Sequence, residues 1–457
     1  MFRSLSQLKP GEVEEFIGIR GYASKSSGIG GVIKSRPEDF LTWEVLVNGM
    51  DARRIYESWT SYAEGLGDHV LAVMRKKGID TIRASTAIAR ELHLRPKMVS
   101  VCGIKDKMSI SWQFITLPKN SIKREGLKLG DLVHVLPIRV FTRPLNSKLL
   151  AVNVFEITIR ELCGDPAEAE SCLEELKSKG LPNFYGHQRF GITRPITPIV
   201  GKLMMLGKLE EAVKEFLMDF SPLESEENRK ARERLSSDLN LESALEYFPR
   251  SLRYERAMLK YLVAHDGDYR GALRALPLRL RRLMVESVSA LIFNKALSKI
   301  MRTGNLNELE IGDFVVKVDV FGRPEPGRPI VVKEGNMGQV ERLRKLGKLV
   351  VALPVPGYLV DVPKSGKGEA ILEAMEELEI SPEMFRLREI PEASTRGSLR
   401  PIIVPKWSCE VIRREERSLT FRINLPPGCY ATILLREIMK PRTPLAFVGK
   451  MNNNDRV

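Results

Sequence analysis

Residues 103–114 of this chain read GIKDKMSISWQF, and this segment decides how the surrounding sequence is interpreted. Residues 97–103 alternate in a way that predicts a strand, and residues 111–117 predict another. The short connection between them contains a glycine and Asp106, which is typical of a tight turn. We therefore expect two paired strands with a single carboxylate on the turn that joins them.

The charges around Asp106 indicate what this carboxylate could do. Lys105 and Lys107 flank it in the sequence. Two neighbouring ammonium groups favour the charged form, so Asp106 is expected to be ionised at neutral pH. An ionised carboxylate on a turn, surrounded by cations, suits a nucleophile that acts on a polyanionic substrate. The alternative is an ordinary Asx-turn, which is the more common role of aspartate in such a turn when the segment is taken alone.

A second segment, LPNFYGHQRFG at residues 181–191, combines three aromatic residues with amides, an arginine and two glycines. The glycines predict sharp turns that hold Phe184, Tyr185 and Phe190 in fixed positions. Aromatic rings stack on unpaired bases, amides read base edges and arginine binds phosphate, so the composition favours a nucleic-acid site. The alternative is a turn with aromatic core anchors, and Phe184 and Phe190 are expected to be core residues.

A third segment, VIKSRPEDF at residues 32–40, places Lys34 and Arg36 beside a turn that Pro37 stiffens. Taken alone, it predicts only a solvated surface lysine.

These segments together resemble the TruD family of pseudouridine synthases. The matching stretches are IKSRPEDF, GIKDKMSISWQF, NFYGHQRFG and a fourth, LPPGCYATILLREIM at residues 425–439. Residues 68–96, just before the Asp106 turn, also follow the order of the family. The middle of the chain matches loosely, best in GDFVVKVD (312–319) and ALPVPG (352–357), and its length resembles the archaeal and eukaryotic branch.

The resemblance implies an α+β fold. It consists of a pseudouridine-synthase-like catalytic domain, with a mixed, mainly antiparallel sheet flanked by helices, and an inserted α+β domain. The implied catalytic domain is discontinuous and comprises residues 1–210 and 405–457, while residues 211–404 form the insertion. RNA is expected in a cleft between the two domains.

The resemblance also implies the activity and the site. The protein is expected to isomerise uridine to pseudouridine in tRNA, at position 13 of the D arm, without a metal or redox cofactor. Asp106 corresponds to the family's catalytic aspartate, and Lys34 to the basic residue that pairs with it. Whether Asp106 attacks the sugar carbon or removes a sugar proton stays open. Tyr185 corresponds to the aromatic ring placed against the uracil. The remaining expected pocket or RNA-binding residues are Asn183, Gln188 and Arg189.

Composition agrees with an RNA partner. The 457 residues include 72 Lys and Arg against 58 Asp and Glu, a net charge of +14 with a pI near 9.5. Such a balance favours capture of phosphates, although a generally basic surface is the competing explanation. The cluster Arg279, Arg281 and Arg282 is one candidate RNA contact. Glutamine is scarce, which is a thermophile pattern, yet Gln113 and Gln188 lie inside the motifs.

Cysteine and histidine usage predicts a reducing, cytoplasmic setting. The five cysteines form no C-x-x-C pair, so we expect buried thiols rather than disulfides or a zinc site. The five histidines lack metal-ligand spacing. No signal peptide or membrane-spanning run is indicated.

Secondary-structure patterns are clear over parts of the chain. Residues 79–93 predict a helix capped by Asp80, and residues 149–159 predict a long strand. Residues 203–302 are nearly all helical in pattern, and residues 312–363 return to short strands.

Two other functions remain as alternatives. A non-catalytic RNA-binding protein would share the basic surface and the aromatic residues but would have no use for the carboxylate of Asp106. An RNA methyltransferase would need a glycine-rich loop between a strand and a helix, and SSGIGG at residues 26–31 precedes no clear helix.

Overall fold

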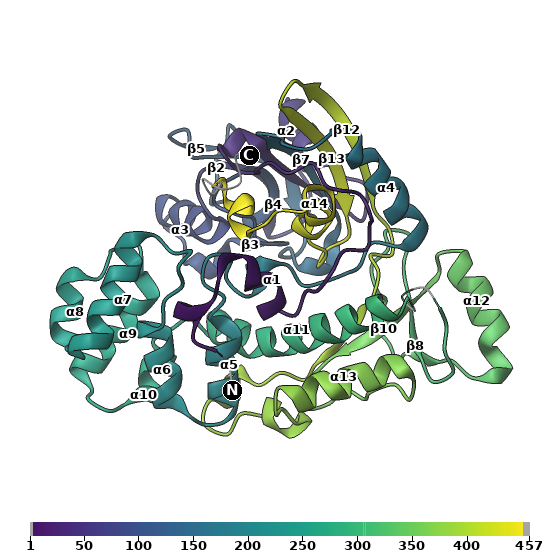
Figure 1. The fold of residues 1–457 in the computed structure, drawn as a ribbon. Helices are drawn as coiled ribbons and strands as arrows, with labels where there is room; N and C mark the ends of the chain where they lie inside the picture. The colour runs from purple at the N-terminus through teal and green to yellow at the C-terminus, as the bar shows by residue number, and fades with distance from the viewer. Residues whose placement is uncertain (1–2, 305, 307, 451–457) are drawn as a thin grey trace.

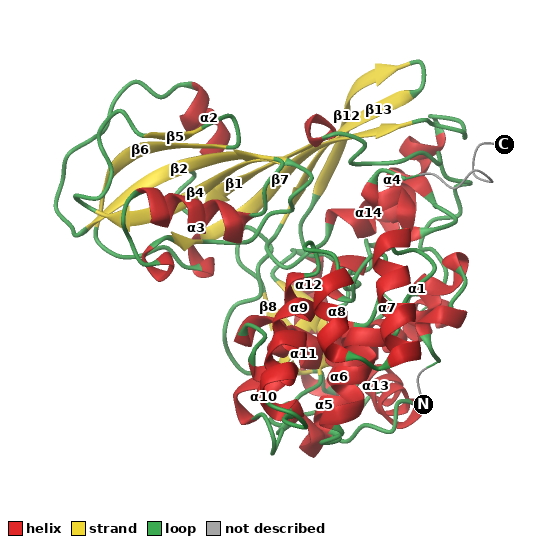
Figure 2. Cartoon of the chain, turned by 90° about the vertical axis from the view of Figure 1, so that its left-hand side faces the viewer, coloured by secondary structure: helices red, strands yellow, loops and turns green. Residues whose placement is uncertain are grey.

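The computed structural model describes residues 3–304, 306 and 308–450. A large twisted sheet with its own helices lies on one side of the molecule, and a mainly helical part lies on the other (Figures 1 and 2).

The large sheet has nine strands in the order β12-β13-β7-β1-β4-β2-β6-β5, with β3 paired to β4. Only β1 and β4 run parallel, and every other pairing is antiparallel, which confirms the expected mixed, mainly antiparallel sheet. The strands are β1 (Phe40–Leu46), β2 (His69–Lys77), β3 (Ser100–Val101), β4 (Ile110–Pro118), β5 (Leu127–Leu129), β6 (Val133–Phe141), β7 (Leu150–Arg160), β12 (Ser408–Glu415) and β13 (Ser418–Leu425).

Both faces of the central strands are covered, so β4 is buried along almost its whole length. Leu71 and Val73 of β2 pack on one face, in a cluster that includes residues of α2 (Ala52–Glu57). Ala72 and Met74 point to the other face and pack with residues of α3 (Thr81–Glu91). This two-residue alternation is what a pleated strand imposes. The predicted cap is confirmed, because Asp80 accepts a hydrogen bond from the Arg83 amide at 2.9 Å.

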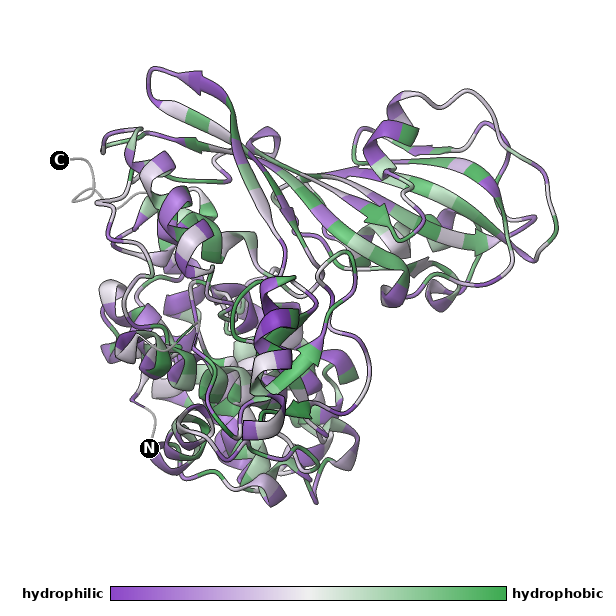
Figure 3. Cartoon of the chain, turned by 90° about the vertical axis from the view of Figure 1, so that its right-hand side faces the viewer, coloured by the Kyte–Doolittle hydropathy of each residue, from purple (hydrophilic) through white to green (hydrophobic). Residues whose placement is uncertain are grey.

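Two further helices flank the other end of the sheet, α4 (Glu168–Lys179) and α14 (Ala431–Met439). They pack against each other, and every residue of α14 is buried. The strands of the large sheet carry many hydrophobic residues, whereas polar residues are frequent on the helices around it (Figure 3).

The helical part is built around α11 (Leu278–Thr303), a long helix with most of its residues buried. Helices α5 and α13 pack along it, and a four-stranded sheet in the order β11-β10-β8-β9 lies beside it. The other elements here are α1 (Val13–Phe16), α5 (Thr197–Met205), α6 (Leu209–Met218), α7 (Glu226–Asp238), α8 (Leu241–Tyr247), α9 (Arg253–Ala264), α10 (Tyr269–Arg274), α12 (Met337–Lys345), α13 (Gly366–Glu377), β8 (Phe314–Lys317), β9 (Ile330–Val331), β10 (Leu349–Val355) and β11 (Ser398–Pro401).

The fully buried side chain of Asn294 joins α11 to two segments from elsewhere in the chain. Its amide group donates to the carbonyl oxygens of Ile17 and Tyr185 at 3.0 and 3.1 Å, and its oxygen accepts from the Tyr185 amide at 2.8 Å. One continuous hydrophobic core extends across both parts. The N-terminal segment, the aromatic motif and α11 are therefore fixed to one another.

Two local expectations were wrong. The strand before the Asp106 turn is only Ser100–Val101, because Pro96–Met98 forms a 3-10 turn. Of the five free cysteines, Cys163 is exposed and Cys429 is half-buried. Cys163 follows β7 in a loop, where its thiol packs against Gly30 at the surface. None of the helices in the described ranges is long and apolar enough to cross a membrane.

Candidate active site

Buried polar side chains fix the Asp106 turn through hydrogen bonds to its main chain. Gln113 on β4 donates to the Gly103 carbonyl at 2.9 Å and accepts from the Thr81 hydroxyl at 2.8 Å. The same hydroxyl accepts from the Lys105 amide at 2.9 Å. Gln113 is fully buried, so its amide fixes the turn instead of facing solvent. This gives a structural role to one of the few glutamines of the chain, which the sequence places inside a motif.

Lys34 provides the counter-charge of Asp106. Its ammonium forms an ion pair with Asp106 Oδ2 and lies 4.5 Å from the centre of the Phe40 ring. Lys34 is 5% exposed and Asp106 is 44% exposed, so the pair joins a buried cation to a carboxylate that is open on one side. The structure thus brings together two residues that lie far apart in the sequence.

Lys105 does not neutralise Asp106, contrary to the expectation from the sequence. Its ammonium lies 3.2 Å from Glu44 Oε1 and donates to the side chain of Asn153. Glu44 is fully buried on β1 and also accepts from the Phe114 amide at 3.0 Å. A buried carboxylate requires a partner, and Lys105 is drawn to it. Lys105, although next to Asp106 in the sequence, therefore stabilises the turn through Glu44 and Asn153.

A second buried lysine contacts the Asp106 turn from β2. Lys76 is fully buried and its ammonium donates to the main-chain carbonyl of Asp106 at 2.6 Å. Ser109 donates to the same carbonyl at 2.7 Å. Burial lowers the pKa of Lys76 to about 8, against the attraction of Asp106 and Asp80 for its ammonium.

Asp106 lies in an open cavity of about 480 Å³ between the large sheet and the helical part. Three aromatic rings, those of Phe40, Phe155 and Tyr430, contribute to its wall. The other residues of the wall are Thr42, Cys102, Gly103, Ile104, Lys105, Ser147, Leu150, Asn153, Gln188, Arg279, Pro427, Gly428, Cys429, Ala431 and Thr432. A carboxylate in a partly aromatic cavity is suited to a flat base attached to a sugar.

Tyr185 lies behind this wall. Its side chain is only 8% exposed, and the Arg400 guanidinium lies 4.1 Å from the centre of its ring. The ring meets those of Phe293 and Tyr430 edge-on, at centroid distances of 5.7 and 6.2 Å. Burial raises the pKa of Tyr185 above its usual range. Tyr430 is the aromatic residue of this group that lines the cavity.

The other residues predicted from the aromatic motif divide between wall and support. Gln188 lines the cavity and accepts a hydrogen bond from the Thr432 hydroxyl at 3.1 Å. Asn183 is buried and accepts from Arg400 at 2.7 Å, which holds the guanidinium over Tyr185. Arg189 donates to Glu286 at 3.1 Å.

His187, to which the sequence assigned no role, is buried with Nε2 3.3 Å from Glu14 Oε1. Phe184 and Phe190 are buried as expected.

The basic cluster at the start of α11 separates into different roles. Arg279 is exposed and lines the cavity. Arg281 forms an ion pair with Glu392, and Arg282 donates to the Glu392 carbonyl at 2.9 Å. Of the three, only Arg279 lines the cavity.

Tyr430, Glu44 and Arg400 were missed as site residues. Tyr430 could have been found, since it lies within the fourth matching stretch, LPPGCYATILLREIM. A lone acid inside the apolar strand FLTWEVL was a weaker signal for Glu44. Arg400 carried no local signal.

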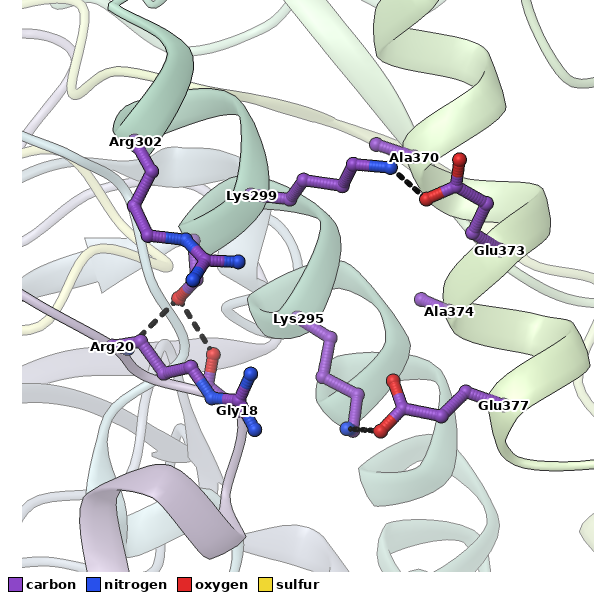
Figure 4. A pocket seen from close by; sticks show the side chains of 10 residues that line it. Gly18, Arg20, Lys295, Lys299, Arg302, Ala370, Glu373, Ala374 and Glu377 are labelled. Carbon is purple, nitrogen blue, oxygen red and sulfur yellow. Dashed lines mark hydrogen bonds and ion pairs between the residues drawn. The ribbon is translucent and has the colours of Figure 1, made fainter.

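A second, smaller hollow of about 100 Å³ lies between α11 and α13 (Figure 4). Both of its lysines are paired: Lys295 contacts Glu377 at 2.6 Å, and Lys299 contacts Glu373. Gly18 also lines the hollow, and its carbonyl accepts a hydrogen bond from the Ser298 hydroxyl at 2.7 Å. These contacts join the helices to the N-terminal segment, and the hollow is separate from Asp106. No cluster of three metal-ligating side chains occurs within residues 3–304, 306 and 308–450.

Comparisons with known proteins cover nearly the whole chain. The sequence profile of the family described as tRNA pseudouridine synthase D (TruD) matches residues 16–438. A "Probable tRNA pseudouridine synthase D" of Methanosarcina mazei is 31% identical over 445 residues, covering 94% of this chain and 98% of the relative. The protein of the same name from Pyrococcus furiosus is 34% identical over 422 residues, covering 92% and 98%.

A crystal structure of the TruD protein of Methanosarcina mazei has the same fold. It superposes with a TM-score of 0.74 at 29% identity, covering 96% of this chain and 100% of that one. The family match and the fold together define a pseudouridine synthase, an isomerase. This chain belongs to the TruD family of tRNA pseudouridine synthases.

Proposed function

We propose that this protein converts uridine 13 in the D arm of tRNA to pseudouridine, with Asp106 as the catalytic carboxylate. The observation that carries the proposal is the Lys34–Asp106 ion pair at the wall of an aromatic-lined cavity, in a chain of the TruD family. Lys34 holds the carboxylate in position, because its ammonium contacts Asp106 Oδ2.

The reaction replaces the C–N bond between sugar and base by a C–C bond. The bond from the sugar C1′ to the uracil nitrogen breaks, the base turns, and C1′ bonds to a ring carbon. That carbon then loses its proton, and the released nitrogen takes up a proton, so the composition is unchanged. Asp106 serves either by attacking the sugar carbon or by removing a sugar proton, and both routes need an ionised carboxylate that reaches the ribose. The exposed side of Asp106 leaves room for that approach.

For the base, we propose that half-buried Tyr430 offers the ring that lines the cavity and that Tyr185 supports it from behind. The edge-on contact between the two rings fixes the angle of Tyr430. Gln188, on the same wall, presents an amide that can read the uracil edge. Asn183 positions the two rings indirectly, because it accepts a hydrogen bond from Arg400, which lies over Tyr185. The Arg189 guanidinium also lies over Tyr185, 5.2 Å from the ring centre.

For the RNA, we propose that phosphates bind along the cavity edge, where exposed Arg279 projects from the helical part. The net charge of +14 supports electrostatic capture of tRNA. We also propose that residues 211–404 are an insertion into a catalytic domain of residues 1–210 and 405–457. All nine strands of the large sheet come from outside that insertion. Because Asn294 and Arg400 hold the aromatic motif, the two domains are expected to fold together.

The test is to map pseudouridine in a tRNA transcript after incubation with the purified protein and EDTA. The expected result is one pseudouridine at position 13, and its absence from a transcript with cytidine at that position. Binding without modification would favour a non-catalytic RNA-binding protein. A new methyl group that required S-adenosylmethionine would favour a methyltransferase. Modification at another site would overturn only the position.

Two further expectations belong to this proposal. The protein is expected to work in the cytoplasm, where its tRNA substrate is found, and to come from a thermophile. The scarcity of glutamine and the many ion pairs support the second expectation, which a melting temperature above about 80 °C would bear out.

A further inference from the structure

Lys76 differs from the other fully buried cations of this protein. Four large cationic side chains with less than 2% exposure are Arg232, Arg436, Lys76 and Lys367. Arg232 contacts Glu224 and Glu255, Arg436 contacts Glu14 and Glu437, and Lys367 contacts Glu310 and Asp313. Lys76 alone among them has no carboxylate partner within the described residues.

The contact that Lys76 does make is to the reacting turn. Its ammonium donates at 2.6 Å to the main-chain carbonyl of Asp106, whose side chain faces the cavity. Strand β2 is fixed on both sides by β4 and β6, where Lys76 lies opposite Ser111 and Val133. The cation thus connects a rigid strand to the turn that carries the carboxylate.

Burial disfavours the proton of Lys76 more than the surrounding charges favour it. Asp106 and Asp80 attract the ammonium, the first from the turn and the second from the start of α3, whereas Lys34 and Lys105 repel it. Burial is the largest effect and acts against the charge. An unpaired buried cation costs stability, so a role in function is the natural reason for keeping it.

We propose that Lys76 is a positioning residue: its ammonium holds the main chain of the Asp106 turn so that the carboxylate stays against Lys34, and loss of its proton releases the turn in alkaline solution. This inference rests on the proposed function of Asp106. The direction of the pH dependence follows from the burial of the cation, which disfavours its charged form. The pKa of Lys76 is lowered to about 8, so the proton is present at neutral pH and is lost as the pH rises through that value.

The experiment measures single-turnover pseudouridine formation from pH 6 to 9.5 for the wild type, Lys76→Met and Lys76→Arg. Lys77→Met is the matched control, since Lys77 is the next residue and its ammonium forms an exposed pair with Glu38. We expect Lys76→Met to lower the rate about tenfold or more at pH 7, with tRNA affinity within about threefold. Its melting temperature should be unchanged or higher, because the Ser109 bond still satisfies the Asp106 carbonyl.

The pH profile separates positioning from structure. The wild-type rate should fall near pH 8, Lys76→Arg should move the fall to higher pH, and Lys76→Met should lose it. A Lys76→Met rate within about threefold of wild type, an unchanged alkaline fall in that variant, or a rate loss that follows a lower melting temperature would each overturn the inference. An inactive wild type would instead overturn the proposed function and remove the basis of this inference with it.

Discussion

Replacing Lys34 by Met tests the ion pair on which the proposed chemistry depends. The change removes the ammonium that contacts Asp106 and keeps an unbranched side chain next to the Phe40 ring. Without the cation, the carboxylate loses the contact that holds it in position. The effect should therefore appear in the chemical step.

The magnitude follows from the exposure of the two partners. A hydrogen bond to a charged group contributes about 1.5–3 kcal/mol. Asp106 is 44% exposed, so water replaces part of the interaction and the lower half of that range applies. About 2 kcal/mol corresponds to about a 30-fold lower rate. The free energy of unfolding should change by less than about 1 kcal/mol, because the carboxylate left behind remains hydrated.

The assay is single-turnover release of tritium from tRNA labelled at C5 of uridine, with enzyme in excess. Lys77→Met removes the same charge from the end of β2, where Lys77 forms an exposed pair with Glu38, and should keep its rate within about twofold. Equal loss in both variants would mean that general charge matters and not this pair. A Lys34→Met rate close to wild type would refute the argument outright.

Three further predictions concern the rest of the site and the fold. Tyr430→Ala should lower the single-turnover rate about 10-fold to 100-fold while Tyr430→Phe keeps it, since stacking is worth about 1–3 kcal/mol per base; equal damage by both would assign the role to the hydroxyl. Arg279→Gln should reduce the slope of log affinity against log salt by about 1, whereas Arg282→Gln should not, in filter binding across a salt series. Burial alone would raise the pKa of Glu14, but the Arg436 guanidinium lowers it to about 2, against 4.5 for the unperturbed group. The stability from this pair is thus present above about pH 4.5 and lost toward pH 2, so Glu14→Gln should cost about 3 kcal/mol at pH 7 and little at pH 2 in urea unfolding; a pH-independent cost would contradict the sign.

The sequence predicted the regular elements because their signals are local. The Asp80 cap, the long strand β7 and the helices between residues 203 and 302 all follow from patterns a few residues apart. Burial of Phe184 and Phe190 was also predictable, because large aromatic side chains next to glycine turns rarely stay exposed.

Charge pairing could not be predicted in the same way. Lys105 is beside Asp106 in the sequence, but its ammonium pairs with Glu44, a buried residue of β1. Arg281 lies in a basic cluster, but Glu392 neutralises it from more than a hundred residues away. The partner of a charge depends on which carboxylates the fold buries nearby, and that information is absent from the local pattern.

Replacing Asp106 by Asn tests the central claim most directly. The hydrogen bonds from Lys76 and Ser109 reach the main-chain carbonyl, so an amide side chain should leave the turn in place. Pseudouridine formation by this variant, measured by tritium release and by mapping the tRNA, should be undetectable, with tRNA affinity within about threefold and an unchanged melting temperature. Turnover near the wild-type rate would contradict the account, and a large loss of melting temperature would show that Asp106 serves the turn and not the reaction.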